Sequence, residues 1–491
     1  MVILYNPPST AQKKPVLPMS LLALGALLED EWDYCIIDGD LDADPVGAIE
    51  RAIREMDAAI LGVTVMPGPQ LAHAVVHSRC LKAMHPGLTI VWGGYFPTQH
   101  PDVCLRADYV DYVVRGYGET AFKGLVGALR RGADPTVLPG VAYRDRESGT
   151  IRSNELAPMP HPDQLPGFPY HRLDVPRYVR RTFMGERTLP HHSSYGCPFS
   201  CNFCAVVNMA HGRWKPQSAE RAAATVRYLV RRWGIDAVEF YDNNFFVGEA
   251  RTAEFAERIE DLGIGWWAEA RIDTLSRYSA CTWQVMRDSG LRMVFMGAES
   301  GSDETLGRMD KGGTSSTETT LTVVEKMGHY GIVPELSFVL GNPPDAETDA
   351  RQTLAFIRTV KRVNPLTEII MYLYAPVPLQ GQLYDLARAG GFQYPDTLDD
   401  WVTAEWQEFS QRRSRRNPWM EGRLYQQVQD FERVINAYYP TCTNPNLPGL
   451  WRWALKALSA WRYHLRFYRY PVELRVLNKL LGYQRPETSG F

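Results

Sequence analysis

The stretch Tyr195-Gly-Cys197-Pro-Phe-Ser-Cys201-Asn-Phe-Cys204 places three of the chain's eight cysteines within eight residues. Three thiolates on one loop, bounded by glycine and proline, can converge on one face of an iron–sulfur cube. Such clusters normally take four cysteines, and no fourth cysteine is near. We therefore predict a [4Fe–4S] cluster on Cys197, Cys201 and Cys204, with one iron left open to chelate a further ligand.

A zinc site is the main alternative that these residues allow. A structural zinc site would need a fourth ligand, and His191, His192 or His211 could serve. However, a spacing of three residues and then two matches no usual zinc pairing, and a redox pair would need only two thiols. The other five cysteines are scattered, which excludes a disulfide framework in so long a chain.

The residues around the cysteine stretch predict a full or partial βα barrel over 187–395. Strand patterns alternate there with helical patterns, and such barrels carry their chemistry on the loops at the carboxyl ends of the strands. The expected strands are 188–194, 237–241, 265–270, 292–297, 333–340 and 368–374.

Residues 1–150 predict a doubly wound parallel sheet, because five apolar strand patterns alternate with amphipathic helices. The expected strands are 2–5, 34–37, 59–65, 88–92 and 109–114. Ligands of such sheets lie at the carboxyl ends of the strands, where four loops carry glycine, proline or acidic residues: 38–44, 67–70, 93–97 and 116–119. The run from Gly116 to Ala121 imitates a dinucleotide fingerprint, but it follows the fifth strand rather than the first, so we do not predict NAD binding.

The remaining segments predict a connector and a helical end. Residues 151–186 are rich in proline and polar groups, as linkers are. Residues 396–491 predict a mostly helical domain that caps the active site. We expect one of its helices to pack on the barrel with a solvated basic face, and a membrane-surface contact is the alternative. The expected basic face is Arg452, Lys456, Ser459, Arg462 and Arg466, opposite Trp453, Leu455, Leu458 and Trp461.

Bulk composition narrows the function classes. A net charge of -3 gives no general attraction to nucleic acid, so no nucleic-acid partner is predicted. No stretch reaches the roughly 18 consecutive apolar residues that span a bilayer, and the first thirty residues lack a secretory layout. We expect a cytoplasmic protein.

The cysteine spacing at the start of a βα barrel resembles the radical S-adenosylmethionine (SAM) superfamily over the whole middle domain. The resemblance implies that the open iron binds the amino and carboxylate groups of SAM. One electron, from a flavodoxin or ferredoxin-type donor, would then cleave SAM to methionine and a 5′-deoxyadenosyl radical.

Further short matches to that superfamily follow in the expected order along the barrel. They imply that Phe203 packs on adenine, that Arg271 neutralises a SAM carboxylate, and that Glu299 and Ser300 lie near the ribose and the amino acid. The strand end expected to contact the SAM amino group lacks the family's usual glycine–glycine–glutamate. The remaining SAM-binding residues implied by the resemblance are Tyr241, Asp242, Asn243, Gly341 and Tyr374.

A flavodoxin-like sheet ahead of such a barrel resembles the cobalamin-binding branch of the superfamily. The segment after Asp38 lacks the histidine that ligates cobalt in other cobalamin proteins, so the resemblance implies a corrin held by loops and shape. A sheet that has lost its ligand and serves as scaffold is the alternative. The cobalamin-binding residues implied are Asp38, Thr64, Pro67, Gln70, Gly93, Gly94, Tyr95, Gly116, Gly118 and Glu119.

The resemblance implies methyl transfer to an unactivated carbon of a small molecule, either lipid-like or a natural-product intermediate. Non-methylating oxidation, cyclisation or dehydration is the second hypothesis, and the anaerobic magnesium-protoporphyrin ester cyclases are similar in domain order. A tRNA methylthiotransferase is disfavoured, since Cys35, Cys80 and Cys104 do not form a second cluster. A non-catalytic electron-transfer or scaffold protein is disfavoured by the SAM-like motifs. We expect the substrate pocket between the two domains, under the C-terminal segment.

Overall fold

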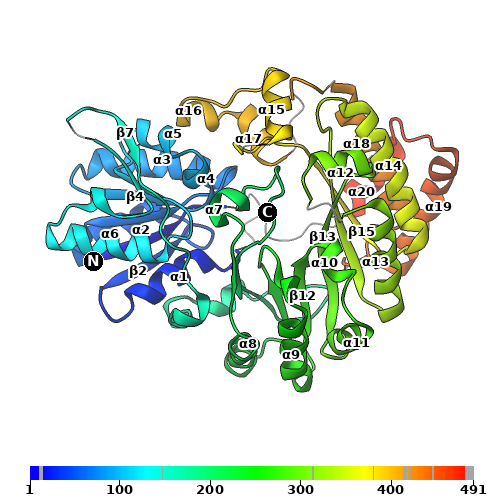
Figure 1. The fold of residues 1–491 in the computed structure, drawn as a ribbon, viewed down its shortest axis with the longest axis horizontal. Helices are drawn as coiled ribbons and strands as arrows, with labels where there is room; N and C mark the ends of the chain where they lie inside the picture. Colours follow the sequence, from blue (N-terminus) through cyan, green and yellow to red (C-terminus); the bar gives the residue numbers. More distant parts are fainter. Residues whose placement is uncertain are drawn as a thin grey trace.

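The computed structural model describes residues 1–9, 15–145, 147–311, 315–379, 381–412, 417–420, 422–444 and 447–481. Two α/β units lie side by side (Figure 1), the first in blue and cyan and the second in green. Three short helices extend between them along one edge: α15 (Gln382–Ala389), α16 (Leu398–Trp401) and α17 (Ala404–Ser410). Both predicted α/β units and the helical C-terminal region are confirmed.

The first unit is built on a seven-stranded sheet in the order β2-β1-β3-β4-β5-β6-β7. Its first five strands are parallel and agree with the prediction: β1 (Val2–Asn6), β2 (Tyr34–Asp38), β3 (Ile60–Thr64), β4 (Thr89–Gly93) and β5 (Tyr112–Val114). The sheet then continues antiparallel through β6 (Val141–Arg144) and β7 (Ile151–Ser153). The prediction missed this hairpin because its strands are short and β7 is largely exposed, so it carries little apolar signal.

Helices cover both faces of this sheet, as in a doubly wound fold. One apolar core lies between the sheet and α2 (Pro45–Met56), α3 (Pro69–Met84) and α5 (Pro101–Arg106). The other lies between the sheet and α1 (Met19–Leu28) and α6 (Glu119–Arg131). The short helix α4 (Tyr95–Gln99) follows β4 directly.

The second unit is a partial barrel of six parallel strands in the order β15-β14-β13-β12-β11-β8. Among the described residues β8 and β15 pair on one side only, so the barrel stays open. Its strands are β8 (Thr188–His191), β11 (Ala237–Phe240), β12 (Gly265–Ala270), β13 (Leu291–Glu299), β14 (Val333–Leu340) and β15 (Glu368–Leu373). Side chains alternate along each strand: Val238 and Phe240 pack under the outer helices, whereas Glu239 lies on the interior side. The outer helices are α8 (Ala219–Trp233), α9 (Glu249–Ile259), α11 (Ala280–Asp288), α13 (Thr317–Tyr330) and α14 (Ala346–Val363).

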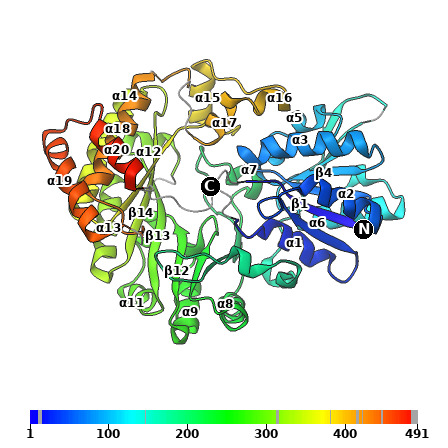
Figure 2. The ribbon, with the colours of Figure 1, turned by 180° about the vertical axis from the view of Figure 1, so that it is seen from behind.

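The last helices lie on the far side of the barrel from the first unit, as both views show (Figures 1 and 2). They are α18 (Gly422–Tyr438), α19 (Gly449–Leu465) and α20 (Val472–Leu481), and α18 packs on α14. The segment that reaches the space between the units is therefore α15–α17, not α18–α20. No helix in the described ranges is long and apolar enough to cross a membrane.

The predicted faces of α19 are only partly right, since Lys456 and Arg466 are exposed and Leu455 is buried, as predicted, whereas the arginines and tryptophans below are not placed as predicted. Arg462 is buried and pairs with Glu473, and Arg452 donates to the backbone oxygens of the loop before the helix. In contrast, Trp453 is 69% exposed and Trp461 is 47% exposed. Arg452 and Arg462 each donate several hydrogen bonds to backbone carbonyl groups of adjacent loops. Their guanidinium groups therefore turn toward the protein rather than toward solvent. The tryptophans are left on the outer face.

Candidate active site

The cysteine loop follows a short antiparallel pair of strands, β9 (Ser194–Gly196) and β10 (Trp214–Pro216). Gly196 has φ 77°, and a Cβ there would lie 2.1 Å from the carbonyl oxygen of Arg213, so only glycine fits. The Gly196 amide donates to the Tyr117 hydroxyl at 2.6 Å. Because Tyr117 lies on the loop after β5, this bond ties the cysteine loop to the first unit.

The three thiols share one largely buried environment. Burial raises the pKa of Cys197, and it raises the pKa of Cys204 to about 12. The charge on Cys201 adds to both pKa shifts, so its sulfur lies near the other two. Thiols with raised pKa values stay protonated at neutral pH, and binding of a metal displaces the proton. Cys197 and Cys204 are therefore not free thiolates at neutral pH.

Two side chains donate toward the sulfurs. The Arg271 guanidinium donates to Cys201 Sγ at 2.8 Å, and Asn244 Nδ2 lies 3.9 Å from Cys197 Sγ. Donors of this kind tune the potential of an iron–sulfur cluster. Sequence reasoning missed Asn244, although it follows the two residues predicted at this strand end.

A single zinc ion fits these residues less well than a cluster. Within the described residues, no three His, Cys, Asp or Glu side chains are grouped so that they could hold one metal ion. His191 contacts Tyr170 and Gln217 instead, and burial lowers its pKa to about 4. A cubane holds its cysteine sulfurs further apart than one ion does, so three separated thiols suit the cluster.

Asp242 and Asn243 follow strand β11, where binding of SAM was predicted. Asp242 is fully buried and accepts bonds from the Ser193 amide and hydroxyl, both at 2.5 Å, and from the Ser194 amide at 3.0 Å. It thereby fixes the backbone that leads into the cysteine loop. Asn243 is exposed at the same strand end. A direct contact of Asp242 with SAM would have to compete with these three bonds.

Arg271 is the centre of a buried charged network. It pairs with Asp273 at 3.0 Å, donates to the backbone oxygen of Lys311, and lies 3.9 Å from the ring centroid of Phe199. Lys311 Nζ in turn lies 3.0 Å from Glu299 Oε1. Arg271 therefore contacts the cysteine loop, Arg271 and Glu299 each already have a partner within the protein, and their contact with SAM stays a prediction.

The other predicted SAM residues fall into two groups. Ser300 donates to Asp349 at 2.9 Å, and the Tyr241 hydroxyl donates to Glu239 at 2.9 Å, so both hydroxyls have protein partners. Phe203 and Tyr374 pack in one apolar cluster, and the Tyr374 hydroxyl is buried without a hydrogen bond. Gly341 has φ 78°, and a Cβ there would lie 2.8 Å from a methionine sulfur. Orphaned polar atoms at Tyr374 and at Asn244 Oδ1 fit a polar ligand such as SAM.

The strand ends of the first sheet form a surface with little side-chain bulk. Gly94 has φ 100° and a Cβ there would lie 3.2 Å from the Val65 backbone, whereas Gly116 has φ 75° and its amide donates to Thr98. Gly93, Gly118 and Thr64 lie along the same edge. A broad ring can approach such an edge closely, so the edge fits a corrin.

Three predicted cobalamin residues are already committed to protein contacts. Asp38 accepts from Asn6 at 2.8 Å and from Tyr178 at 2.6 Å. Gln70 donates to Asn6 at 2.7 Å, which joins the ends of β1, β2 and β3 into one polar chain. Glu119 is buried and bonds to the Tyr195 hydroxyl, which raises the pKa of that hydroxyl. These side chains hold the edge together.

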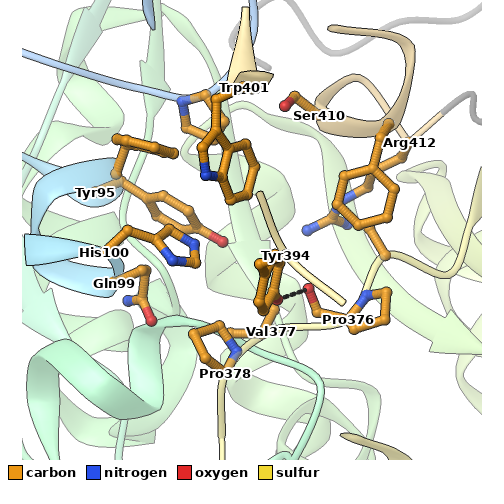
Figure 3. A pocket seen from close by; sticks show the side chains of 14 residues that line it. Tyr95, Gln99, His100, Pro376, Val377, Pro378, Tyr394, Trp401, Ser410 and Arg412 are labelled. Carbon is orange, nitrogen blue, oxygen red and sulfur yellow. Dashed lines mark hydrogen bonds between the residues drawn. The ribbon is translucent and has the colours of Figure 1, made fainter. Parts of the chain in front are cut away.

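A small cavity of about 60 Å³, at the bottom of a wider opening to solvent, lies between the two units (Figure 3). Pro67 and Tyr95 come from the first unit, Pro376 and Val377 from the loop after β15, and Trp401 from α16. The pocket thus lies where the substrate site was predicted. The complete lining is Pro67, Tyr95, Phe96, Gln99, His100, Ala375, Pro376, Val377, Pro378, Tyr394, Trp401, Phe409, Ser410 and Arg412.

Acidic side chains line the inside of the barrel. Glu335 on β14 pairs in register with Glu368 on β15, and Glu269 on β12 lies close enough to Glu335 to affect its own pKa. Burial raises the pKa of both Glu269 and Glu335 to about 8. Glu335 accepts a hydrogen bond from Trp267 Nε1 at 2.9 Å. Glu269 and Glu335 are therefore neutral at pH 7, which reduces the repulsion between them.

The raised pKa of Glu335 predicts a pH-dependent stability. The native state holds this proton up to about pH 8, whereas an unfolded glutamate releases it near its ordinary pKa of 4.5. The unfolded state therefore binds fewer protons across that window, and stability falls as pH rises from about 4.5 to 8. Glu335→Gln should flatten this slope and raise stability at pH 8 by about 2–5 kcal/mol.

Thermal unfolding at pH 5 and pH 8 measures this effect. Glu254→Gln, an exposed change on α9, is the matched control and should leave the slope unchanged. An equal loss of stability between the two pH values in wild type and in Glu335→Gln would show that Glu335 is ionised in the folded protein.

Two family models match the two units. The B12 binding domain matches residues 13–126, and the radical SAM superfamily matches residues 192–357. The chain belongs to the cobalamin-binding radical SAM enzymes. The resemblance predicted from the cysteine spacing is confirmed, and so are the cofactors: a [4Fe–4S] cluster, SAM and cobalamin.

Relatives of this radical SAM enzyme include methyltransferases and cyclases. An uncharacterised methyltransferase of Pyrococcus horikoshii is 29% identical over 366 residues, which are 73% of this chain and 77% of that protein. The anaerobic magnesium-protoporphyrin IX monomethyl ester cyclase of Synechocystis sp. is 28% identical over 331 residues, covering 65% of this chain and 64% of the cyclase. The solved structure of the methyltransferase TsrM from Kitasatospora setae, with cobalamin and a [4Fe–4S] cluster bound, matches with a TM-score of 0.63 and 17% identity. That match covers 84% of this chain and 81% of TsrM, and it shows a common fold.

Proposed function

We propose that this radical SAM enzyme methylates an unactivated carbon of a small molecule. The observation that carries the proposal is the direct bond between the two units, from the Gly196 amide to Tyr117. This bond brings the cysteine loop to the strand ends that fit a corrin, so a carbon radical and a methyl carrier would meet across one space. The methyltransferases among the relatives support the same function.

The chain's own residues would position the reacting groups. When bound, the cluster and SAM supply a carbon radical, and cobalamin supplies a methyl group. Cys197, Cys201 and Cys204 would hold the cluster, Asp242 fixes the backbone that leads to them, and Arg271 donates to one sulfur. The aromatic walls of the pocket would keep water from the radical.

We propose a reduced flavodoxin or ferredoxin as the electron donor, because the cluster must receive one electron for each cleavage of SAM.

We also propose that the protein works in the cytoplasm. None of its eight cysteines forms a disulfide bond, which suits a reducing compartment.

Labelled SAM tests the proposed reaction. Anaerobically reconstituted enzyme, with SAM carrying a trideuterated methyl group and a chemical reductant, should release 5′-deoxyadenosine and transfer the label to one compound of a small-molecule extract. A product that loses hydrogen without gaining label would establish the cyclase-type or oxidase-type reaction instead. No deoxyadenosine from protein with a full cluster would refute both.

We also propose that α19 and α20 contact an anionic membrane surface. Their outer face combines exposed apolar side chains, including Trp453, Trp461 and Leu465, with exposed cations such as Lys456 and Lys479. Between residues 449 and 481 there are seven lysines and arginines and one acid, Glu473, which is paired with Arg462. Tryptophan and lysine on one helix face are typical of interfacial helices.

Vesicle sedimentation tests the membrane contact. The full chain should sediment with phosphatidylglycerol vesicles and less with pure phosphatidylcholine. Trp453→Ala with Trp461→Ala should weaken binding about tenfold or more, because two large apolar groups leave the interface. Val137→Ala, at an exposed apolar position outside the patch, is the control. Equal binding by the double variant and wild type would contradict the proposal.

A further inference from the structure

Lys311 is a buried lysine beside the cysteine loop that sequence reasoning missed. Its side chain is 6% exposed, and Nζ donates to the Gly297 carbonyl oxygen at 2.6 Å and lies 3.0 Å from Glu299 Oε1. A buried ammonium is costly unless it is both paired with an opposite charge and hydrogen-bonded. These two contacts meet both needs, so Lys311 and Glu299 form one neutral pair.

The backbone around Glu299 is shaped to present its carboxylate. Glu299 has φ 61°, in the left-handed region that glutamate seldom adopts, and the pairing of β13 with β14 shifts register between Gly297 and Glu299. The side chain folds back over Gly297, where an added Cβ would lie 1.9 Å from Glu299 Oε1. Bulges and left-handed residues of this kind re-aim side chains at functional sites. The strand therefore directs Glu299 to one place, and Lys311 holds it there.

The same lysine is joined to the cysteine loop through its backbone. Its carbonyl oxygen accepts a hydrogen bond from Arg271, which in turn donates to Cys201 Sγ at 2.8 Å. The residue before it also binds the loop, because the Ser200 hydroxyl donates to Asp310 at 3.1 Å. The lysine and its partner carboxylate therefore have a fixed position relative to the cysteine loop.

A carboxylate whose charge is already balanced suits a neutral donor better than a second cation. Within the described residues, Glu299 Oε1 is taken by Lys311, whereas Oε2 makes no hydrogen bond. An ionised carboxylate accepts strongly from hydroxyl groups. In SAM, the bond that is cleaved at the cluster joins the sulfonium to the ribose. The two ribose hydroxyls are therefore the neutral donors nearest the cysteine loop.

We propose that Lys311 is a positioning residue for SAM, which holds Glu299 so that Oε2 accepts a hydrogen bond from a ribose hydroxyl. Without the lysine, Glu299 loses its counter-charge and can turn away from the ribose. This role requires that SAM binds, and it is independent of whether a substrate is methylated.

Binding of SAM and of its 2′-deoxy and 3′-deoxy analogues, without reductant, tests the role of Lys311. Anaerobic calorimetry of the full chain, loaded with cluster and cobalamin, should show that SAM binds about tenfold or more tightly than one of the two analogues, because that analogue lacks a hydrogen bond to a charged group. In Lys311→Met this preference should fall to about twofold or less. Lys311→Arg, which keeps a cation of different shape, should lie between.

Two further variants separate positioning from a structural role. A merely structural lysine would weaken all three ligands alike and leave their ratio unchanged. Glu299→Gln should reduce the preference, and adding Lys311→Met to it should reduce the preference no further, as in a double-mutant cycle. This double variant holds no unpaired buried charge, so it gives a result even where Lys311→Met does not fold. Lys361→Met removes another buried lysine, on α14, and is the matched control that should keep the wild-type preference.

Three results would overturn the proposal: no preference for SAM over either analogue in wild type, an unchanged preference in folded Lys311→Met, or a further loss of preference when Lys311→Met is added to Glu299→Gln. Failure of methyl transfer is read separately. An enzyme that transfers no label, yet prefers SAM to a deoxy analogue through Lys311, would refute the proposed methylation and support the role of the lysine.

Discussion

Alanine at Cys197, Cys201 and Cys204 together is expected to abolish cluster binding and with it all formation of 5′-deoxyadenosine. We propose these three thiols as the protein's ligands for the cluster, because they are grouped on one loop and all lie largely out of solvent. Iron and sulfide content, the visible absorption of the cluster and deoxyadenosine release should fall to background together.

Single replacements of two other cysteines are the controls. Cys442→Ala and Cys281→Ala remove thiols far along the chain from the cysteine loop, so iron content should match wild type. Because a triple variant can misfold, circular dichroism and cobalamin uptake should be measured alongside. A folded triple variant that keeps four irons would show that other residues hold the cluster.

Most of the fold could be predicted because its strands are buried on both faces and so carry strong apolar signals. The barrel strand β14 has every residue buried, and its prediction agrees with the structure residue for residue. The hairpin β6–β7 could not be predicted, since β7 is three residues long at an exposed sheet edge. The faces of α19 could not be predicted correctly for another reason. The helical spacing of residues does not show that Arg452 donates to carbonyl groups of the preceding loop.

The candidate site, too, could be predicted from the sequence only in part. The cysteines proposed for the cluster are recognisable because three of them fall within eight residues of the sequence. Asp242 and Ser300 lie at the predicted strand ends, but their hydrogen bonds to Ser193 and Asp349 depend on tertiary contacts that no local pattern carries. Arg412 lies more than 200 residues after the cysteines in an irregular segment, and only the fold brings it near Cys204.

Replacing Arg271 is expected to destabilise the barrel, because the change removes a guanidinium that pairs with the buried carboxylate of Asp273. Asp273 is 2% exposed and receives two bonds from the guanidinium, at 3.0 and 3.1 Å. Removal of one member of such a buried pair costs about 3–5 kcal/mol. Arg271→Ala should therefore unfold at a clearly lower temperature, whereas Arg271→Ala combined with Asp273→Ala should recover part of the loss.

The same pair of variants separates structure from cofactor binding. If Arg271 also meets the SAM carboxylate, both variants should bind SAM more weakly by about 1.5–3 kcal/mol, since both lack the charge-assisted contact. Calorimetric titration of SAM into cluster-loaded protein measures this directly. Asp273→Asn, which keeps the guanidinium and a hydrogen-bond acceptor, is the matched control and should retain SAM affinity. Unchanged affinity in Arg271→Ala would restrict Arg271 to its contacts with Asp273 and Cys201. If the double variant is no more stable than Arg271→Ala, the stability lost in Arg271→Ala does not come from the charge of Asp273.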